Sequence, residues 1–131
     1  MNHEEELIRS FFIPAKRQRY LGFVSKPKTR QKFLRELAHF KSLDPRYLLP
    51  IPPNQQHPKD IAQILAQKGA PPLCWITSED RRLDGKEMPL IEALGEGVGR
   101  QMGTFLSCIP GTLAYFEGED VGFRWVLEHR L

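Results

Sequence analysis

Basic residues are concentrated in one stretch of the chain, from Lys16 to Arg35, which holds eight Lys or Arg and no Asp or Glu. Nucleic-acid binding requires cations along one surface, where they displace the counterions of phosphates, and exposed aromatic rings add stacking surfaces for unpaired bases. Tyr20 and Phe23 lie within the stretch and are candidates for such stacking. The anion-binding residues that we predict are Lys16, Arg17, Arg19, Lys28, Arg30 and Lys32.

Other interpretations of this stretch stay open. The partner could be an acidic protein, or the cations could form a solvated face, with Tyr20 and Phe23 in the core. The chain carries 12 Lys/Arg and 5 Asp/Glu up to Lys59, but 7 and 11 from Asp60 onward, within a net charge of +3. The basic half could therefore pack beside the acidic half, in one molecule or between two copies. A homo-oligomer of this kind would weaken with salt, because exposed charge pairs are screened.

A second set of residues could perform acid–base or metal chemistry. Glu79 and Asp80 directly follow the apolar run Leu73–Thr77, which we predict to be a buried strand. Ligands gather outside the carboxyl ends of parallel strands in open α/β sheets, so these two carboxylates are candidates for a metal ligand or a general base. Oxygen-only clusters suit Mg²⁺ or Mn²⁺, although no spacing here is diagnostic and adjacent loop carboxylates are usually solvated. Further carboxylates that could join them are Asp84, Glu87 and Glu117.

Cys108 is the candidate nucleophile, because it lies near the end of a predicted strand and beside the turn Pro110–Gly111. A reactive thiol needs a nearby His or a helix N-terminus to lower its pKa, and the sequence places neither beside Cys108. We therefore expect Cys74 and Cys108 to be reduced core residues. The Cys and His residues lack the spacing of a zinc site, and the glycines of residues 95–103 match neither phosphate-binding nor dinucleotide-binding motifs. We predict no metal and no cofactor, and a packing role for these glycines.

The helices and strands expected from the sequence must position these residues. Their order indicates an α/β fold, with α+β as the alternative, in a single domain of residues 1–131. Three strands in succession, separated by Pro and Gly turns, predict an antiparallel meander at residues 104–109, 112–117 and 122–129. In the last of them, Phe123, Trp125 and Leu127 alternate with polar positions, which is typical of one face on a core and one in water. Together with the strand of residues 73–77 between two helices, the pattern predicts a mixed sheet of about four or five strands, with three or four helices mainly on one face.

In the first half of the chain, we expect a basic, helical portion of about residues 1–49. Its first helix begins after an Asn2 cap and ends before Pro14, and its clearest helix runs from Pro27 to Phe40 or Lys41. We expect residues 17–24 to be irregular or extended, with a helix weakened by Gly22 as the alternative. A short edge strand is expected near residues 47–51, because prolines remove ladder donors there. The Pro-rich residues 50–58 form a candidate hinge to an α/β portion of residues 59–131, which includes helices at about 58–68 and 89–100.

These observations favour a small non-catalytic binding or regulatory module whose basic face meets nucleic acid or an acidic protein. The alternative is a small metal-assisted enzyme on a phosphate-containing or other anionic substrate, with Glu79 and Asp80 as ligands or base. No apolar run approaches the roughly 18 residues that a membrane span needs. The acidic N-terminus leads into no apolar signal segment. We therefore expect a cytoplasmic protein without a membrane partner.

Overall fold

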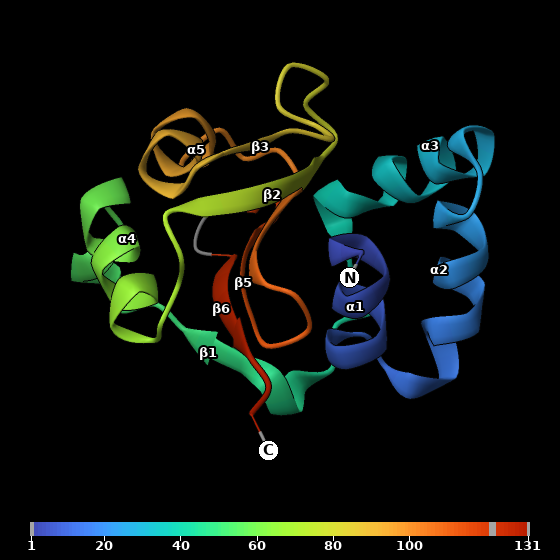
Figure 1. The fold of residues 1–131 in the computed structure, drawn as a ribbon, viewed down its shortest axis with the longest axis horizontal. Coiled ribbons are helices and arrows are strands. Elements are labelled where there is room, and N and C mark those ends of the chain that lie inside the picture. Colours follow the sequence, from blue (N-terminus) through green and yellow to red (C-terminus); the bar gives the residue numbers. More distant parts are fainter. Residues whose placement is uncertain (1, 121–122, 131) are drawn as a thin grey trace.

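The computed structural model describes residues 2–120 and 123–130, in which a six-stranded sheet lies between two layers of helices (Figure 1). The strands are β1 (Leu48–Pro50), β2 (Leu73–Ser78), β3 (Glu87–Pro89), β4 (Thr104–Ile109), β5 (Leu113–Glu117) and β6 (Arg124–Glu128). The α-helices are α1 (His3–Phe11), α2 (Arg17–Val24), α3 (Pro27–Glu36), α4 (Pro58–Gln67) and α5 (Leu90–Gly97). Short 3₁₀ turns are η1 (Pro14–Lys16), η2 (Leu37–His39), η3 (Pro45–Tyr47) and η4 (Pro53–Gln55). The predicted α/β class is confirmed.

The sheet has the strand order β1-β6-β5-β4-β2-β3, and every neighbouring pair is antiparallel. The prediction of a mixed sheet was wrong, because β2 runs antiparallel to both of its neighbours, β3 and β4. The sheet also exceeds the expected strand number, since the short edge strand β3 follows the charged loop after β2. The other edge is β1, whose Pro50 fits a position outside the sheet centre. The start of the last predicted strand, at Gly122, lies outside the described residues.

Helices cover both faces of the sheet, which corrects the expectation of helices mainly on one face. Helices α1, α2 and α3 share one core with alternate strand residues such as Phe105 and Leu127. Helices α4 and α5 share the second core with the residues between them, such as Leu106 and Val126. Figure 1 shows the two helical layers on opposite sides of the strands. The second face of β6, expected in water, is therefore buried at Val126.

Local signals explain most of the helices. The Asn2 side chain accepts a hydrogen bond from the Glu5 backbone N–H at 3.1 Å and caps α1, whose Leu7, Ile8 and Phe11 are buried. Pro27 stands at the first position of α3, where its missing N–H has no helical partner. No helix of the described residues is long and apolar enough to cross a bilayer.

The prediction for residues 17–24 was wrong, because this segment forms helix α2. Its own sequence is weakly amphipathic, and tertiary packing decides its conformation. The Tyr20 ring is 2 % exposed and lies 5.2 Å from the Phe12 ring and 5.4 Å from the Phe40 ring, measured between centroids. Tyr20 is therefore a core residue, as the alternative interpretation of this aromatic proposed, and gives no exposed surface for base stacking.

Gly103, directly before β4, allows the helical layer of α1–α3 to approach the sheet. A Cβ atom at this position would lie 2.3 Å from the Leu37 carbonyl carbon, in the η2 turn that follows α3. Backbone atoms cannot move aside as a flexible side chain can, so only glycine fits here. This contact confirms a packing role for the last glycine of residues 95–103.

We expect Gly103→Ala to lower the free energy of unfolding by about 1–3 kcal/mol or more, because the added methyl overlaps the Leu37 backbone. Gly22→Ala is the matched control, since Gly22 is exposed within α2 and a Cβ there has no atom within 4 Å. That change should raise stability by about 0.5–1 kcal/mol. Urea unfolding of both variants measures the difference. A neutral Gly103→Ala would contradict the close approach of η2 to β4.

Candidate functional site

Helix α3 separates its basic residues into an inward and an outward set. Phe33 and Leu34 are buried, and Arg30 lies on the same side of the helix, within about 60° at 100° per residue. Lys28, Lys32 and Arg35 lie about 140–160° around the helix from Arg30 and are all exposed. We call these three residues the α3 stripe. Their side chains form no salt bridge or hydrogen bond with residues of the described part of the chain.

Arg30 is enclosed by two carboxylates from distant parts of the sequence. Its guanidinium donates to Glu4 of α1 at 3.0 and 2.5 Å, and to Asp84 of the β2–β3 loop at 2.6 and 2.8 Å. Hydrogen bonds from Arg30 to Asp84 and to Glu4 raise the pKa of the guanidinium far above its ordinary value. Thr77 of β2 donates to the same Glu4 carboxylate at 2.7 Å. Arg30 was predicted as an anion contact, but its donors are occupied within the protein.

Three more of the predicted residues lie at the start of α2. Arg17 donates its Nε–H to the Phe12 carbonyl at 3.0 Å, which leaves it partly occupied. Lys16 and Arg19 line a concave region of about 380 Å³, whose floor includes the Tyr20 and Phe40 rings. We call it the α2–α3 cleft. Its charged and titratable lining residues are Lys16, Arg19, Tyr20, Arg35, Glu36, His39 and Lys41.

The cleft contains residues that sequence reasoning missed. Arg35 follows Lys32 by three positions and Lys28 by seven, a helical spacing that could have placed it in the predicted set. Lys41 follows the η2 turn and lines the same cleft as Lys16 and Arg19, a proximity that no sequence signal indicates. The Nε2 atom of His39 lies 2.5 Å from a Glu119 carboxylate oxygen.

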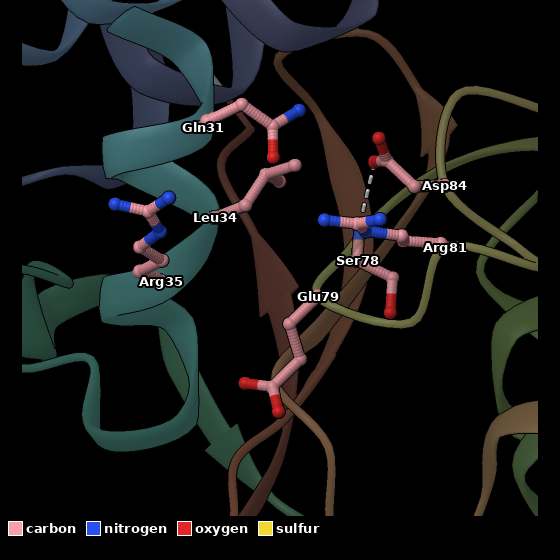
Figure 2. A pocket seen from close by; sticks show the side chains of 7 residues that line it. All are labelled: Gln31, Leu34, Arg35, Ser78, Glu79, Arg81 and Asp84. Atoms are coloured by element: carbon pink, nitrogen blue, oxygen red, sulfur yellow. Dashed lines mark hydrogen bonds between the residues drawn. The ribbon is translucent and has the colours of Figure 1, made fainter.

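A second cavity, of about 560 Å³, separates α3 from the loop that follows β2 (Figure 2). Figure 2 shows α3 side chains on one wall and side chains from the end of β2 and its loop on the other. The lining residues are Gln31, Leu34, Arg35, Ser78, Glu79, Arg81 and Asp84. Glu79 forms no ion pair with the described residues, so this loop cavity holds one uncompensated carboxylate beside two arginines.

The carboxylates considered for catalysis do not form a free cluster. Asp80 is 6 % exposed and bound by Arg82 at 3.0 Å, and this hydrogen bond holds the pKa of the Asp80 carboxyl below its usual range. Asp84 accepts from Arg30 and from the Ser78 backbone N–H at 2.9 Å (Figure 2).

Two further carboxylates that sequence analysis considered lie outside the loop cavity. Glu117 is buried, where it accepts from the backbone N–H of Gly99 and pairs with Arg124. Glu87 is exposed on the edge strand β3. Within residues 2–120 and 123–130, no three His, Cys, Asp or Glu side chains lie close enough together to hold a metal ion.

Cys108 and Cys74 are free thiols in the core beneath α4 and α5. Their side chains are 2 % and 1 % exposed, and burial raises the pKa of each thiol to about 12. A thiol in such surroundings is protonated at neutral pH and is a poor nucleophile. The structure therefore agrees with the expectation of two reduced core cysteines.

Comparison with known proteins adds no functional information. No protein-family model matches the chain, and neither the curated proteins nor the solved structures contain a significant match.

We expect Arg30→Ala to lower the free energy of unfolding by about 3 kcal/mol, because it leaves Glu4 and Asp84 partly buried without their cation. Arg30→Lys should recover part of this loss, since one ammonium keeps the charge but cannot reproduce the fork of hydrogen bonds. Lys32→Ala, two positions along the helix, is the control and should change stability by less than about 0.5 kcal/mol. Urea unfolding at neutral pH distinguishes the three. Equal stability of the Arg30→Ala and Lys32→Ala variants would contradict a structural role for Arg30.

Both cysteines should resist thiol reagents in the folded protein. With a pKa near 12, only about one thiol in ten thousand is ionised at pH 8, and burial blocks access. We expect no reaction with a chromogenic disulfide reagent in native buffer and two thiols per chain after denaturation in urea. Rapid native labelling of Cys108 would instead revive its role as a nucleophile.

Proposed function

We propose that the chain is a non-catalytic binding module whose basic N-terminal face meets an anionic partner. The observation that carries this proposal is the α3 stripe, where Lys28, Lys32 and Arg35 are exposed and form no ion pair with the described residues. These cations span about 10 Å of helix on the side opposite Arg30. Three unpaired charges in a row repel one another in the free protein, and an anion relieves that repulsion.

Nucleic acid fits this face better than an acidic protein does. Stable protein interfaces bury an apolar centre, enriched in aromatic residues, within a polar rim. The large hydrophobic side chains exposed in the described residues are Leu49, Leu73 and Ile91, and none of them belongs to α2 or α3. A surface of cations without an apolar centre suits a phosphate backbone, where counterion release supplies the affinity.

The mode of contact follows from the position of Tyr20. Because this ring is in the core and the partly buried Phe23 ring packs against the same core beneath Arg19, the proposed surface has cations without fully exposed stacking platforms. Phosphate contacts position a protein on nucleic acid but do not select a sequence. We therefore propose sequence-independent binding, with a preference for duplexes, whose charge density exceeds that of single strands. A cytoplasmic location is part of this proposal.

The catalytic alternative has less support. Asp80 and Asp84 are each bound to an arginine, and Glu79 is the carboxylate of the loop cavity that forms no ion pair with the described residues. Metal-assisted or two-carboxylate chemistry at this loop would need Asp80 to leave its pair with Arg82. Self-association through the basic face stays an outcome of the binding test rather than a separate candidate.

We expect the protein to bind labelled duplex DNA at low salt, with an affinity that falls steeply as salt rises, because displaced counterions drive the interaction. Lys28→Glu/Lys32→Glu should abolish most of this binding and reduce the slope of log affinity against log salt by about 2. Fluorescence anisotropy at several salt concentrations measures both quantities.

The control is Lys59→Glu/Gln63→Glu/Gln67→Glu, which alters net charge equally but places the carboxylates on exposed positions of α4, beyond the other face of the sheet. This variant should lose much less affinity than the α3 variant. Equal losses would show that net charge alone matters and would overturn the stripe as the contact surface. No binding by the unaltered protein would overturn nucleic acid as the partner. Salt-sensitive dimerisation in sedimentation would instead favour a second copy of the chain.

A further inference from the structure

The α2–α3 cleft differs from the α3 stripe in being concave and in drawing its cations from several segments. Lys16 comes from the η1 turn, Arg19 from α2, Arg35 from the last turn of α3 and Lys41 from the segment after η2. Side chains at positions up to 25 residues apart thus face one hollow. A convex row of charges suits a polymer, whereas a hollow surrounded by charges suits one compact anion.

The charge of the cleft is strongly positive. Its lining includes two lysines and two arginines, against the single carboxylate of Glu36. That carboxylate is already engaged, because it accepts a hydrogen bond from the Tyr20 hydroxyl at 3.0 Å and lies 3.8 Å from the Arg19 guanidinium. Lys16, Arg35 and Lys41 form no ion pair within the described residues, so three cations remain for a ligand.

Part of the cleft is ordered before any ligand arrives. The Arg19 guanidinium lies over the rings of Tyr20 and Phe23, at 5.5 and 5.3 Å from their centroids, which restricts its side chain. The Tyr20 and Phe40 side chains are almost fully buried, and their rings pack against each other with centroids 5.4 Å apart. An apolar floor also lowers the local dielectric constant, so charge pairs formed above it are stronger than on an open surface.

We propose that the α2–α3 cleft binds a phosphate monoester group, held between Lys16, Arg35 and Lys41 with Arg19 beside them. Such a group carries close to two negative charges and three terminal oxygens at neutral pH, so it can contact several cations from different sides at once. A carboxylate has one charge and two oxygens and would leave cations uncompensated. The group could be the terminal phosphate of a nucleic acid or belong to a free phosphorylated small molecule.

The first experiment uses inorganic phosphate as the probe and follows the Nε–H signals of Arg19 and Arg35 by NMR at constant ionic strength. We expect saturable shifts in the unaltered protein and affinity at least about tenfold weaker in Lys16→Ala/Lys41→Ala. Lys28→Ala/Lys32→Ala removes the same charge from the stripe and should leave phosphate binding within about twofold. Absence of saturable shifts, or equal weakening by both double variants, would overturn the phosphate site.

The second experiment identifies the source of the phosphate, by comparing oligonucleotides with a 5′-phosphate and a 5′-hydroxyl end. Tighter binding of the phosphorylated end, lost in Lys16→Ala/Lys41→Ala, assigns the cleft to a nucleic-acid terminus. Inorganic phosphate binding without such a preference assigns it to a small phosphorylated molecule. The two proposals fail separately: duplex binding without phosphate shifts overturns only the cleft, and phosphate shifts without oligonucleotide binding overturn only the stripe.

Discussion

The guanidinium of Arg30 joins three parts of the chain that are far apart in sequence, and the orientation of α3 depends on it. It contacts Glu4 in α1 and Asp84 in the β2–β3 loop. Thr77 donates a further hydrogen bond to Glu4, and the Ser78 backbone N–H donates one to Asp84. Removing such charges from water is costly, so this cluster adds less to stability than its many hydrogen bonds suggest. Its main consequence is to fix which face of α3 points inward. Since Arg30 must face inward, helical geometry turns Lys28, Lys32 and Arg35 outward, and the surface chemistry of α3 follows from a buried contact.

The aromatic core likewise determines which face of the neighbouring helix, α2, points inward. Phe12 has the rings of Tyr20, Phe33, Phe40 and Phe105 around it at centroid distances of 4.9–6.0 Å. These contacts come from five different segments, so the core could form only if residues 17–24 became helical and presented Tyr20 to it. Burial of one large ring outweighs the weak helical preference of that segment. The same burial removes Tyr20 as a platform for bases and turns its hydroxyl toward Glu36.

Sequence patterns predict the elements with a strong period and fail where a contact partner decides. The caps and apolar stripes of α1, α3 and α4 are visible in the chain, as are the turns around β4 and β5. The antiparallel meander of β4, β5 and β6 was predicted, but the antiparallel pairing of β2 was not foreseen, because its apolar run fits a strand buried on both faces in a parallel or an antiparallel sheet. Among the site residues, Lys28 and Lys32 are predictable from their exposed spacing. The pairing of Arg30 is not, since neither Glu4 nor Asp84 is near it in sequence.

Arg35 is shared by three surfaces, because it belongs to the stripe and lines both the α2–α3 cleft and the loop cavity. Its side chain forms no ion pair with the part of the chain that the structure describes, and each of the three surfaces places a different set of groups beside it. Lysines adjoin it along the stripe and in the cleft, which adds positive charge, whereas the Glu79 carboxylate of the loop cavity offsets it. We therefore expect the proposed anion on the α2 side of Arg35, because the cleft adds three further cations, whereas the loop cavity adds only Arg81 together with the Glu79 carboxylate. The loop carboxylates thus lower the positive potential of the loop cavity, and on this proposal the cleft is the more favourable of the two hollows for a phosphate.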